Sequence, residues 1–185
     1  MKAIEVVLDV INGIPLSFHS SAGVFSKRKV DTGTRSLLEN LVIPKEGLVA
    51  DVGCGYGPIG IYVALSNPSL RVVMMDVDPN AVKLAKKNVE INGVNDRVEV
   101  IKSDVLSATD LKFDAIFSNP PLSKGVDFLR KFAKCAHEKL KDEGHVQLVV
   151  YRGEENVKKE FSQFFGNITV VKRVKGYSII LIKKT

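Results

Sequence analysis

The sequence predicts an α/β protein with a doubly wound, mostly parallel sheet, and three observations support this fold class. From residue 48 onward, short apolar segments alternate with amphipathic ones, which is the pattern of strands followed by helices. Asn12-Gly13 separates two apolar stretches near the N-terminus and indicates an N-terminal β-hairpin. Lys175-Gly176 separates two more near the C-terminus, so a second hairpin should close the chain.

Capping residues and apolar spacing locate the individual elements. Pro44 and Gly47 should end the first helix, and Pro58 is tolerated in the first turn of the second. Asp78 suits the N-cap of the third helix, which Gly93 should close. The expected helices cover residues 31–42, 58–65, 79–92, 126–140 and 155–164. The expected strands cover residues 4–10, 14–18, 48–51, 70–76, 97–101, 113–118, 145–151, 168–174 and 177–182.

Composition describes an ordinary globular protein. The 185 residues suit one domain, and 45% hydrophobic with 26% charged residues argues against a disordered chain. The longest apolar stretch, 58–65, is far shorter than the roughly 20 residues of a membrane span, and the N-terminus lacks an apolar block of the signal-peptide type. Cys54 and Cys135 are too few for a disulfide framework. We therefore expect a single-domain cytoplasmic protein.

The net charge of +6 attracts polyanions only modestly. One basic run is Lys27, Arg28 and Lys29, and another group crowds the C-terminus. Each run alone is most simply solvated surface, but the two could meet in the fold. Contact with a nucleic acid is thus a hypothesis, which the salt dependence of binding would test. The three histidines lack metal-ligand spacing, so we expect no metal site.

A glycine-rich loop follows the first strand of the predicted Rossmann-like sheet, where such folds bind ligands. Its glycines allow a sharp turn and a close ligand approach; they are Gly53, Gly55, Gly57 and Gly60. Residues 55–60 match the dinucleotide pattern G-x-G-x-x-G. However, Asp51 would repel a pyrophosphate, and Pro58 removes one N–H group that a phosphate would use. A ligand with a cationic amino group suits Asp51 better.

Acidic residues follow the next two strands. Asp76 can accept hydrogen bonds from both hydroxyls of a ribose. Asp104 could accept a hydrogen bond from an adenine amino group, although a solvent-facing turn residue is an equally good reading. Together Asp51, Asp76 and Asp104 would bind an amino acid, a ribose and an adenine. That combination describes S-adenosylmethionine.

The fourth strand runs into Asn119-Pro120-Pro121. The prolines make a rigid turn and give up two N–H donors, which leaves carbonyl groups unpaired. The Asn119 side chain and the Pro120 carbonyl could accept both N–H bonds of an exocyclic amine and hold its lone pair towards a methyl sulfonium. We therefore take Asn119, Pro120 and Pro121 as candidate catalytic residues. An ordinary proline-rich turn is the alternative.

These motifs, in this order, resemble the class I S-adenosylmethionine-dependent methyltransferases over nearly all of residues 30–185. The resemblance implies that the last strand of the sheet is reversed and that an exocyclic nitrogen of a planar system is methylated. The cofactor residues it implies are Asp51, Gly53, Gly55, Gly57, Asp76, Val77, Asp104, Val105 and Asn119.

The segments 23–26 and 31–34 resemble one branch more closely, that of the small-subunit ribosomal RNA guanine-N2 methyltransferases and their single-domain relatives. This implies that residues 1–30 form a hairpin and a segment covering cofactor and substrate, with the core in 31–185. Phe25 and Thr34 would then contact the cofactor or the target base. Ribosomal RNA is the implied partner.

Two departures weaken the assignment of a substrate. The family usually has an aromatic residue where this chain has Leu122, and better-known bacterial members carry a second domain. Leu122, Lys27, Arg28 and Lys29 are the candidate substrate contacts. Methylation of a glutamine amide in a protein or of adenine N6 stays an alternative, as does a non-catalytic, cofactor-binding RNA assembly factor. Intact Asn119 argues against the last.

Overall fold

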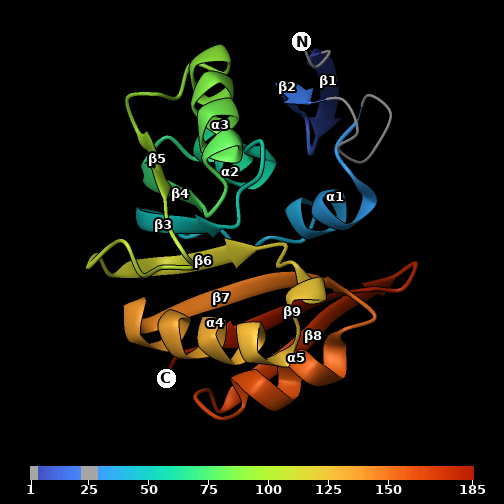
Figure 1. Cartoon of the computed structure of the whole chain (residues 1–185), viewed down its shortest axis with the longest axis vertical. Coiled ribbons are helices and arrows are strands. Elements are labelled where there is room, and N and C mark those ends of the chain that lie inside the picture. Colours follow the sequence, from blue (N-terminus) through green and yellow to red (C-terminus); the bar gives the residue numbers. More distant parts are fainter. Residues whose placement is uncertain (1–3, 22–28) are drawn as a thin grey trace.

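The computed structural model describes residues 4–21 and 29–185 of the chain. They form a seven-stranded sheet of order β5-β4-β3-β6-β7-β9-β8 and a separate two-stranded sheet, β1-β2 (Figure 1). The elements before the Asn-Pro-Pro turn are β1 (Ile4–Ile11), β2 (Ile14–Ser21), α1 (Thr32–Leu38), β3 (Gly47–Val52), α2 (Pro58–Ser66), β4 (Leu70–Asp76), α3 (Pro79–Ile91), β5 (Val98–Lys102) and β6 (Phe113–Ser118). Those after it are the 3-10 helix η1 (Leu122–Lys124), α4 (Val126–Lys139), β7 (Leu140–Tyr151), α5 (Glu154–Phe161), β8 (Asn167–Val174) and β9 (Tyr177–Lys183).

The sheet is parallel except at its last strands. β3, β4, β5, β6 and β7 run in one direction, and β9 is antiparallel to both β7 and β8. The predicted α/β class, the reversed last strand and the N-terminal hairpin are therefore confirmed. One core cluster lies between the sheet and α1, α2 and α3, and the other between the sheet and α4 and α5. Because β3, β4, β5 and β6 are parallel, their carboxyl ends lie at the same edge of the sheet.

Four predicted boundaries were wrong by three residues or more; one is the end of β2, which lies at Ser21 instead of residue 18. The first helix ends at Leu38 instead of residue 42 because the following backbone is bound by a side chain of β7. The Gln147 side chain donates to the Asn40 carbonyl at 2.8 Å and accepts the Val42 N–H at 2.8 Å. β7 begins at Leu140, five positions before the predicted residue 145. α5 ends at Phe161 instead of residue 164.

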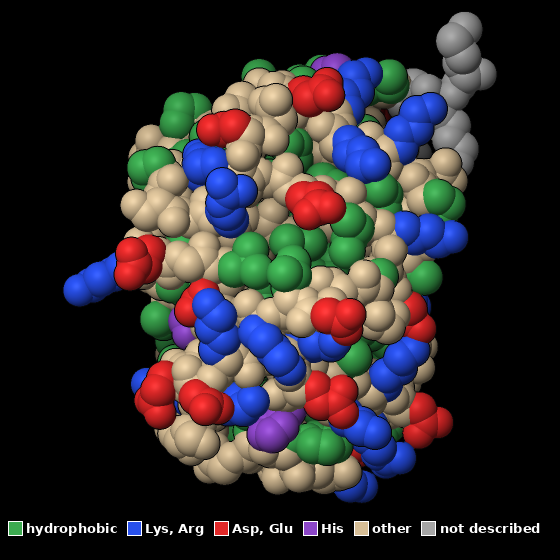
Figure 2. Space-filling view, turned by 90° about the vertical axis from the view of Figure 1, so that its left-hand side faces the viewer, with side chains coloured by type: hydrophobic (Ala, Val, Ile, Leu, Met, Phe, Trp, Pro, Cys, Tyr) green, Lys and Arg blue, Asp and Glu red, His purple; other side chains and the backbone are tan. Residues whose placement is uncertain are grey.

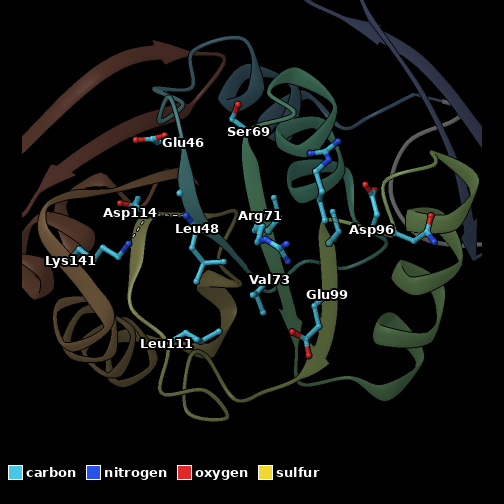
Figure 3. Close-up of a pocket in the computed structure, with 15 residues that line it drawn as sticks. Glu46, Leu48, Ser69, Arg71, Val73, Asp96, Glu99, Leu111, Asp114 and Lys141 are labelled. Carbon is cyan, nitrogen blue, oxygen red and sulfur yellow. Dashed lines mark hydrogen bonds and ion pairs between the residues drawn. The ribbon is translucent and has the colours of Figure 1, made fainter.

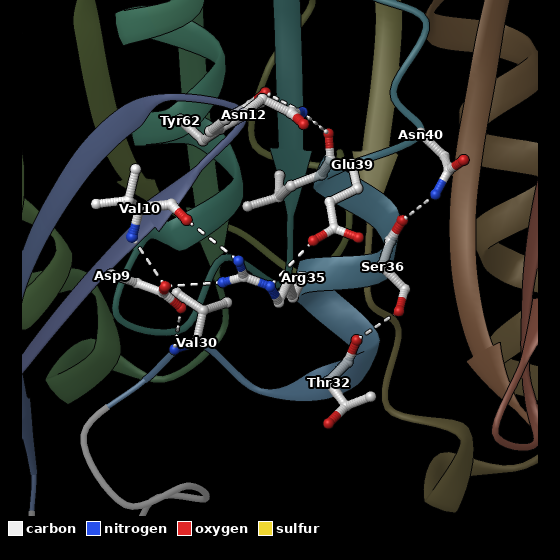
Figure 4. A network of polar contacts seen from close by, with 11 residues as sticks. Asp9, Val10, Asn12, Val30, Thr32, Arg35, Ser36, Glu39, Asn40 and Tyr62 are labelled. Atoms are coloured by element: carbon white, nitrogen blue, oxygen red, sulfur yellow. Dashed lines mark hydrogen bonds and ion pairs between the residues drawn. The ribbon is translucent and has the colours of Figure 1, made fainter.

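The N-terminal hairpin is fixed to the rest of the fold by polar contacts as well as by apolar ones. The Arg35 guanidinium donates to Asp9 at 2.7 Å and to the Val10 carbonyl at 3.1 Å (Figure 4). The Asp9 carboxylate also accepts the Val30 N–H at 3.3 Å. The Asn12 side chain donates to the Tyr62 hydroxyl at 2.8 Å. The hairpin is thereby held against α1 and α2, near the carboxyl edge of the sheet.

A cavity of about 1020 Å³ lies at the opposite edge, where the parallel strands begin. Leu48, Arg71, Val73, Glu99 and Leu111 are among its lining residues (Figure 3). Figure 2 shows this face, with hydrophobic side chains gathered near its middle among charged ones. Of the residues predicted to bind cofactor or substrate, none of those that the structure describes lines this cavity. Within the described part of the chain, every helix is too short or too polar to cross a membrane.

Candidate active site

A second cavity, of about 310 Å³, lies at the carboxyl edge of β3, β4, β5 and β6. It is formed by the loops that follow these four strands and by the start of α4. Its lining residues are Val52, Gly53, Asp76, Val77, Ser103, Asp104, Val105, Asn119, Pro121, Lys124 and Phe128. Six of the residues predicted from sequence as cofactor contacts thus lie around one cavity: Gly53, Asp76, Val77, Asp104, Val105 and Asn119.

The glycine-rich loop leaves room for a ligand. Gly53 and Gly55 have φ angles of +69° and +56°, a conformation that side-chain-bearing residues rarely adopt. A Cβ added to either residue would meet no atom within 4 Å, so the space beside both is open. Gly57 is instead the N-cap residue just before α2, and a Cβ on it would lie 2.8 Å from the Met74 side chain. Gly57 therefore serves the packing of the turn and does not line the cavity.

The Asp76 carboxylate is held by the loops on either side of it. One oxygen accepts the Gly55 N–H at 2.9 Å, and the other accepts the Asp78 N–H at 3.0 Å. The predicted N-cap role of Asp78 is confirmed, since its own side chain accepts the Asn80 N–H. Each carboxylate oxygen has a second lone pair, so Asp76 can still accept two hydroxyl groups.

Asp51 lies beneath the loop and is fully buried. Its Oδ2 accepts the Gly60 N–H at 2.9 Å, whereas its Oδ1 has no partner among the described residues. Burial raises the pKa of this carboxyl to about 7. Asp51 is not among the cavity's lining residues, so its contact with a cofactor amine stays a prediction.

Asp104 and Val105 lie on the β5 side of the cavity. The Asp104 side chain is half-exposed and forms an ion pair with Lys131 of α4. Val105 is buried and has a φ of +53°, which a β-branched residue adopts only when its surroundings impose it. This turn brings both residues to the cavity wall. The role of Asp104 towards an adenine is not tested by these contacts.

Asn119 is oriented by a residue that lies 85 positions earlier in the chain. Its Nδ2 donates to the Oγ1 of Thr34 at 3.1 Å, and Thr34 is buried in the first turn of α1. Because the amide nitrogen is used in this way, Oδ1 is left as an acceptor for a substrate amine. The Pro121 carbonyl accepts the Lys124 N–H at 3.1 Å, and none of the described residues donates to the Pro120 carbonyl. Two acceptors therefore remain at this turn.

Sequence reasoning did not select Phe128, which lines the cavity from the first turns of α4. The signal that could have found it is an aromatic residue soon after the Asn-Pro-Pro turn. The Nζ of Lys124 lies 5.3 Å from the centre of the Phe128 ring. Leu122 is half-buried and packs against Gly153 instead of lining the cavity.

Some predicted contacts cannot be placed. Phe25, Lys27 and Arg28 lie outside the described residues, and Lys29 is described and exposed. Among residues 4–21 and 29–185, no group of His, Cys, Asp and Glu side chains is arranged to hold a metal ion.

A methyltransferase dependent on S-adenosylmethionine is the class of protein that this sheet order and this site define. The chain belongs to the methyltransferase small domain family, whose model matches residues 15–181. It is 36% identical over 173 residues to the uncharacterized protein YbxB of Bacillus subtilis, covering 91% of this chain and 86% of that one.

Two further relatives have named activities. The ribosomal RNA small subunit methyltransferase C of Shewanella amazonensis is 35% identical over 167 residues, which cover 88% of this chain and 48% of that protein. The structure of the Thermus thermophilus 16S rRNA N2 methyltransferase RsmC, in complex with AdoMet and guanosine, superposes with a TM-score of 0.83 at 28% identity. That match covers 100% of this chain and 52% of RsmC. The chain thus spans about half the length of these two methyltransferases.

The residues at the carboxyl edge fit S-adenosylmethionine. Open space beside Gly53 and Gly55 admits a ligand, and the fixed Asp76 carboxylate retains acceptors for a ribose. The buried, unpartnered Oδ1 of Asp51 is suited to a cationic group. Together with the family and with the AdoMet complex of RsmC, this identifies the chain as an S-adenosylmethionine-dependent methyltransferase.

Proposed function

We propose that this protein methylates an exocyclic amino nitrogen, namely N2 of a guanine in ribosomal RNA. The observation that carries the proposal is the hydrogen bond from Asn119 to Thr34, which leaves the Asn119 Oδ1 as an acceptor at the cavity. The names of the relatives support the RNA substrate, and the net charge of +6 is compatible with it. The proposal includes a cytoplasmic location.

In this proposal the protein acts by positioning. The Asn119 side-chain oxygen and the Pro120 carbonyl accept the two N–H bonds of the target amine. An exocyclic amine is a poor nucleophile because its lone pair is delocalised into the ring. Holding both N–H bonds turns the lone pair towards the cavity and stabilises the positive charge that develops on nitrogen. When bound, S-adenosylmethionine supplies the electrophilic methyl group.

No general base is required before methyl transfer, because the amine attacks as a neutral nucleophile and loses a proton afterwards. The chain neighbours of Asn119 are Ser118, Pro120 and Pro121, which carry no group that acts as a base near neutral pH, and this agrees with such a mechanism. Residues of the glycine-rich loop and Asp76 hold the cofactor. Residues 1–30 would cover cofactor and substrate, with residues 31–185 as the catalytic core.

The experiment is transfer of labelled methyl groups from S-adenosylmethionine into RNA from cells lacking this gene, followed by digestion and nucleoside identification. Label in N2-methylguanosine is the expected result. Label in N6-methyladenosine, or in a glutamine of the protein fraction, would replace guanine by those substrates. No label in either fraction would favour a non-catalytic RNA assembly factor.

The matched variant is Asn119→Ala. It should abolish transfer while leaving affinity for S-adenosylhomocysteine nearly unchanged, because Asn119 acts on the amine. A parallel loss of cofactor binding would contradict the role proposed for Asn119.

A further inference from the structure

Two tyrosines and an arginine lie together where β7 ends and β9 begins. Tyr151 and Tyr177 are paired across these strands, and their ring centres are 5.0 Å apart. The Arg152 guanidinium lies over the Tyr151 ring, 5.2 Å from its centre. Tyr151 is 49% exposed and Arg152 is also exposed. An aromatic ring and a guanidinium in cation–π contact are therefore presented to solvent as a pair.

Two neighbours of this pair, Tyr177 and Gly153, connect it to the candidate active site. A Cβ on Gly33 would lie 2.5 Å from Cε1 of Tyr177, so that ring covers the residue before Thr34. A Cβ on Gly153, which follows Arg152, would lie 2.5 Å from Cδ1 of Leu122. Tyr177 therefore links the pair to the residue before Thr34, and Gly153 links it to the residue after the Asn-Pro-Pro turn. Figure 1 shows α1, η1 and the β8–β9 turn at the same edge of the sheet.

Contacts on either side of the pair hold a strained backbone in place. Arg152 has a φ of +50°, which is uncommon for a residue other than glycine, and its N–H donates to the Gly176 carbonyl at 3.0 Å. A Cβ on Gly176 would lie 2.6 Å from Cε2 of Tyr151, so the ring rests on this glycine. Such strain persists only where surrounding contacts impose it, and it gathers at functional sites.

We propose that Tyr151 and Arg152 form a stacking subsite for an unpaired RNA base next to the target nucleotide. This inference rests on the proposed function, since it requires an RNA substrate. Single-stranded bases stack on tyrosine rings and on guanidinium planes, and the positive charge of arginine also attracts the phosphates. The exposed Lys175 in the neighbouring turn adds to that charge. A target base must be unstacked from its neighbours to reach Asn119, and the subsite would replace part of the stacking that a neighbour loses.

Stacking distinguishes this proposal from a merely basic surface. Tyr151→Leu keeps an apolar side chain over Gly176 but removes the aromatic face, whereas Tyr151→Phe keeps the face. The probe is a fluorescently labelled 11-mer of uridine with one central guanosine. Its affinity is measured by anisotropy with S-adenosylhomocysteine present. A second set of probes carries an abasic site on either side of the guanosine.

Tyr151→Leu should weaken binding by roughly 5- to 150-fold, and Tyr151→Phe by less than about twofold. Wild-type protein should bind one of the two abasic probes more weakly than it binds the intact probe. Tyr151→Leu should bind that abasic probe almost as tightly as it binds the intact one, because this variant already lacks the contact with the missing base. Arg152→Ala should weaken binding more than Arg71→Ala, which removes an equal charge at the far edge of the sheet.

Equal affinity of wild type and Tyr151→Leu for the intact probe would overturn the subsite. The subsite would also be overturned if each of the two abasic probes weakened the binding of Tyr151→Leu by the same factor as that of wild type. Unchanged affinity for S-adenosylhomocysteine checks that each variant is folded. Failure of the proposed function is seen separately, as absence of methyl transfer into RNA by wild type, because the anisotropy measurement requires no turnover.

Discussion

The Asn88 side chain on α3 exchanges two hydrogen bonds with the backbone of His19 on β2. Its Oδ1 accepts the His19 N–H at 2.7 Å, and its Nδ2 donates to the His19 carbonyl at 2.9 Å. The same Nδ2 donates to the carbonyl of Tyr56 in the glycine-rich loop at 2.7 Å. Asn88 is fully buried, so one side chain joins the hairpin, the helix and the cofactor loop.

Asn88→Ala should lower the free energy of unfolding by roughly 2–4 kcal/mol, because it leaves partly buried backbone groups of His19 and Tyr56 without these partners. Urea denaturation followed by circular dichroism measures this loss. Asn80→Ala is the matched control, since Asn80 is exposed in the first turn of the same helix. Equal effects of the two substitutions would show that the three hydrogen bonds of Asn88 contribute little.

Thr34→Val should lower kcat by roughly 10- to 100-fold, because the amide of Asn119 loses the acceptor that fixes its orientation. Thr34→Ser keeps the hydroxyl and should retain most activity. Affinity for S-adenosylhomocysteine should stay within about twofold in both variants. Single-turnover methyl transfer is the measurement. If Thr34→Val transferred methyl groups as fast as wild type, another contact would have to orient Asn119.

Asp51 should make cofactor affinity depend on pH. Its pKa is raised to about 7, so in the free protein the carboxyl is increasingly protonated below that value. A cationic amino group beside Oδ1 favours the ionised form, and affinity for S-adenosylhomocysteine should therefore rise from pH 5.5 to pH 7. Calorimetric titration across this range measures it. The dependence should vanish in Asp51→Asn, and a wild-type affinity that is flat with pH would exclude the contact.

Asp51 also makes stability depend on pH, but in the opposite direction: stability should fall, not rise, as pH increases towards 7. A carboxyl whose pKa is raised by folding is protonated in both states at low pH, where it costs nothing. As pH rises towards 7, the unfolded chain loses its proton first, and the folded state becomes less stable in relative terms. The melting temperature of Asp51→Asn should consequently vary less than that of wild type between pH 4 and pH 7.

Asp76→Ala should weaken S-adenosylhomocysteine binding by about 1–3 kcal/mol, the cost of losing hydrogen bonds to a charged group. Because Asp76 also binds the Gly55 N–H, the loss could act through the loop instead of the ribose. An analogue lacking both ribose hydroxyls separates the two. If Asp76 binds the ribose, Asp76→Ala should bind this analogue almost as tightly as wild type does. If the substitution weakens the binding of both ligands equally, the effect is assigned to the loop. Asp96→Ala, an exposed carboxylate at the far edge, is the charge control.

Local signals allowed most of the fold to be predicted. Asn12 and Lys175 adopt the positive φ angles that their turns require, and Asp78 caps its helix as expected. The end of α1 was missed because it depends on Gln147, whose side chain replaces helical hydrogen bonds with others from a distant strand.

Part of the candidate site could likewise be predicted from the sequence and part could not. The loops after successive strands must meet at one edge, so the positions of Asp76 and Asn119 followed from the alternation of elements. The hydrogen bond between Thr34 and Asn119 joins residues 85 positions apart and leaves no local pattern. Phe128 was missed for a different reason: it does follow the Asn-Pro-Pro turn closely, but one aromatic residue in an amphipathic helix is most simply read as core.

The link between Gln147 and the segment after α1 bears on how the enzyme is made. Gln147 and Asn40 are 107 positions apart, so the segment behind Thr34 acquires these partners only after residue 147 has been synthesised. Such non-local contacts form late and slowly in folding. A chain emerging from the ribosome would therefore hold its glycine-rich loop and Asp76 well before Thr34 is anchored. Competence to recognise cofactor should precede competence to transfer the methyl group.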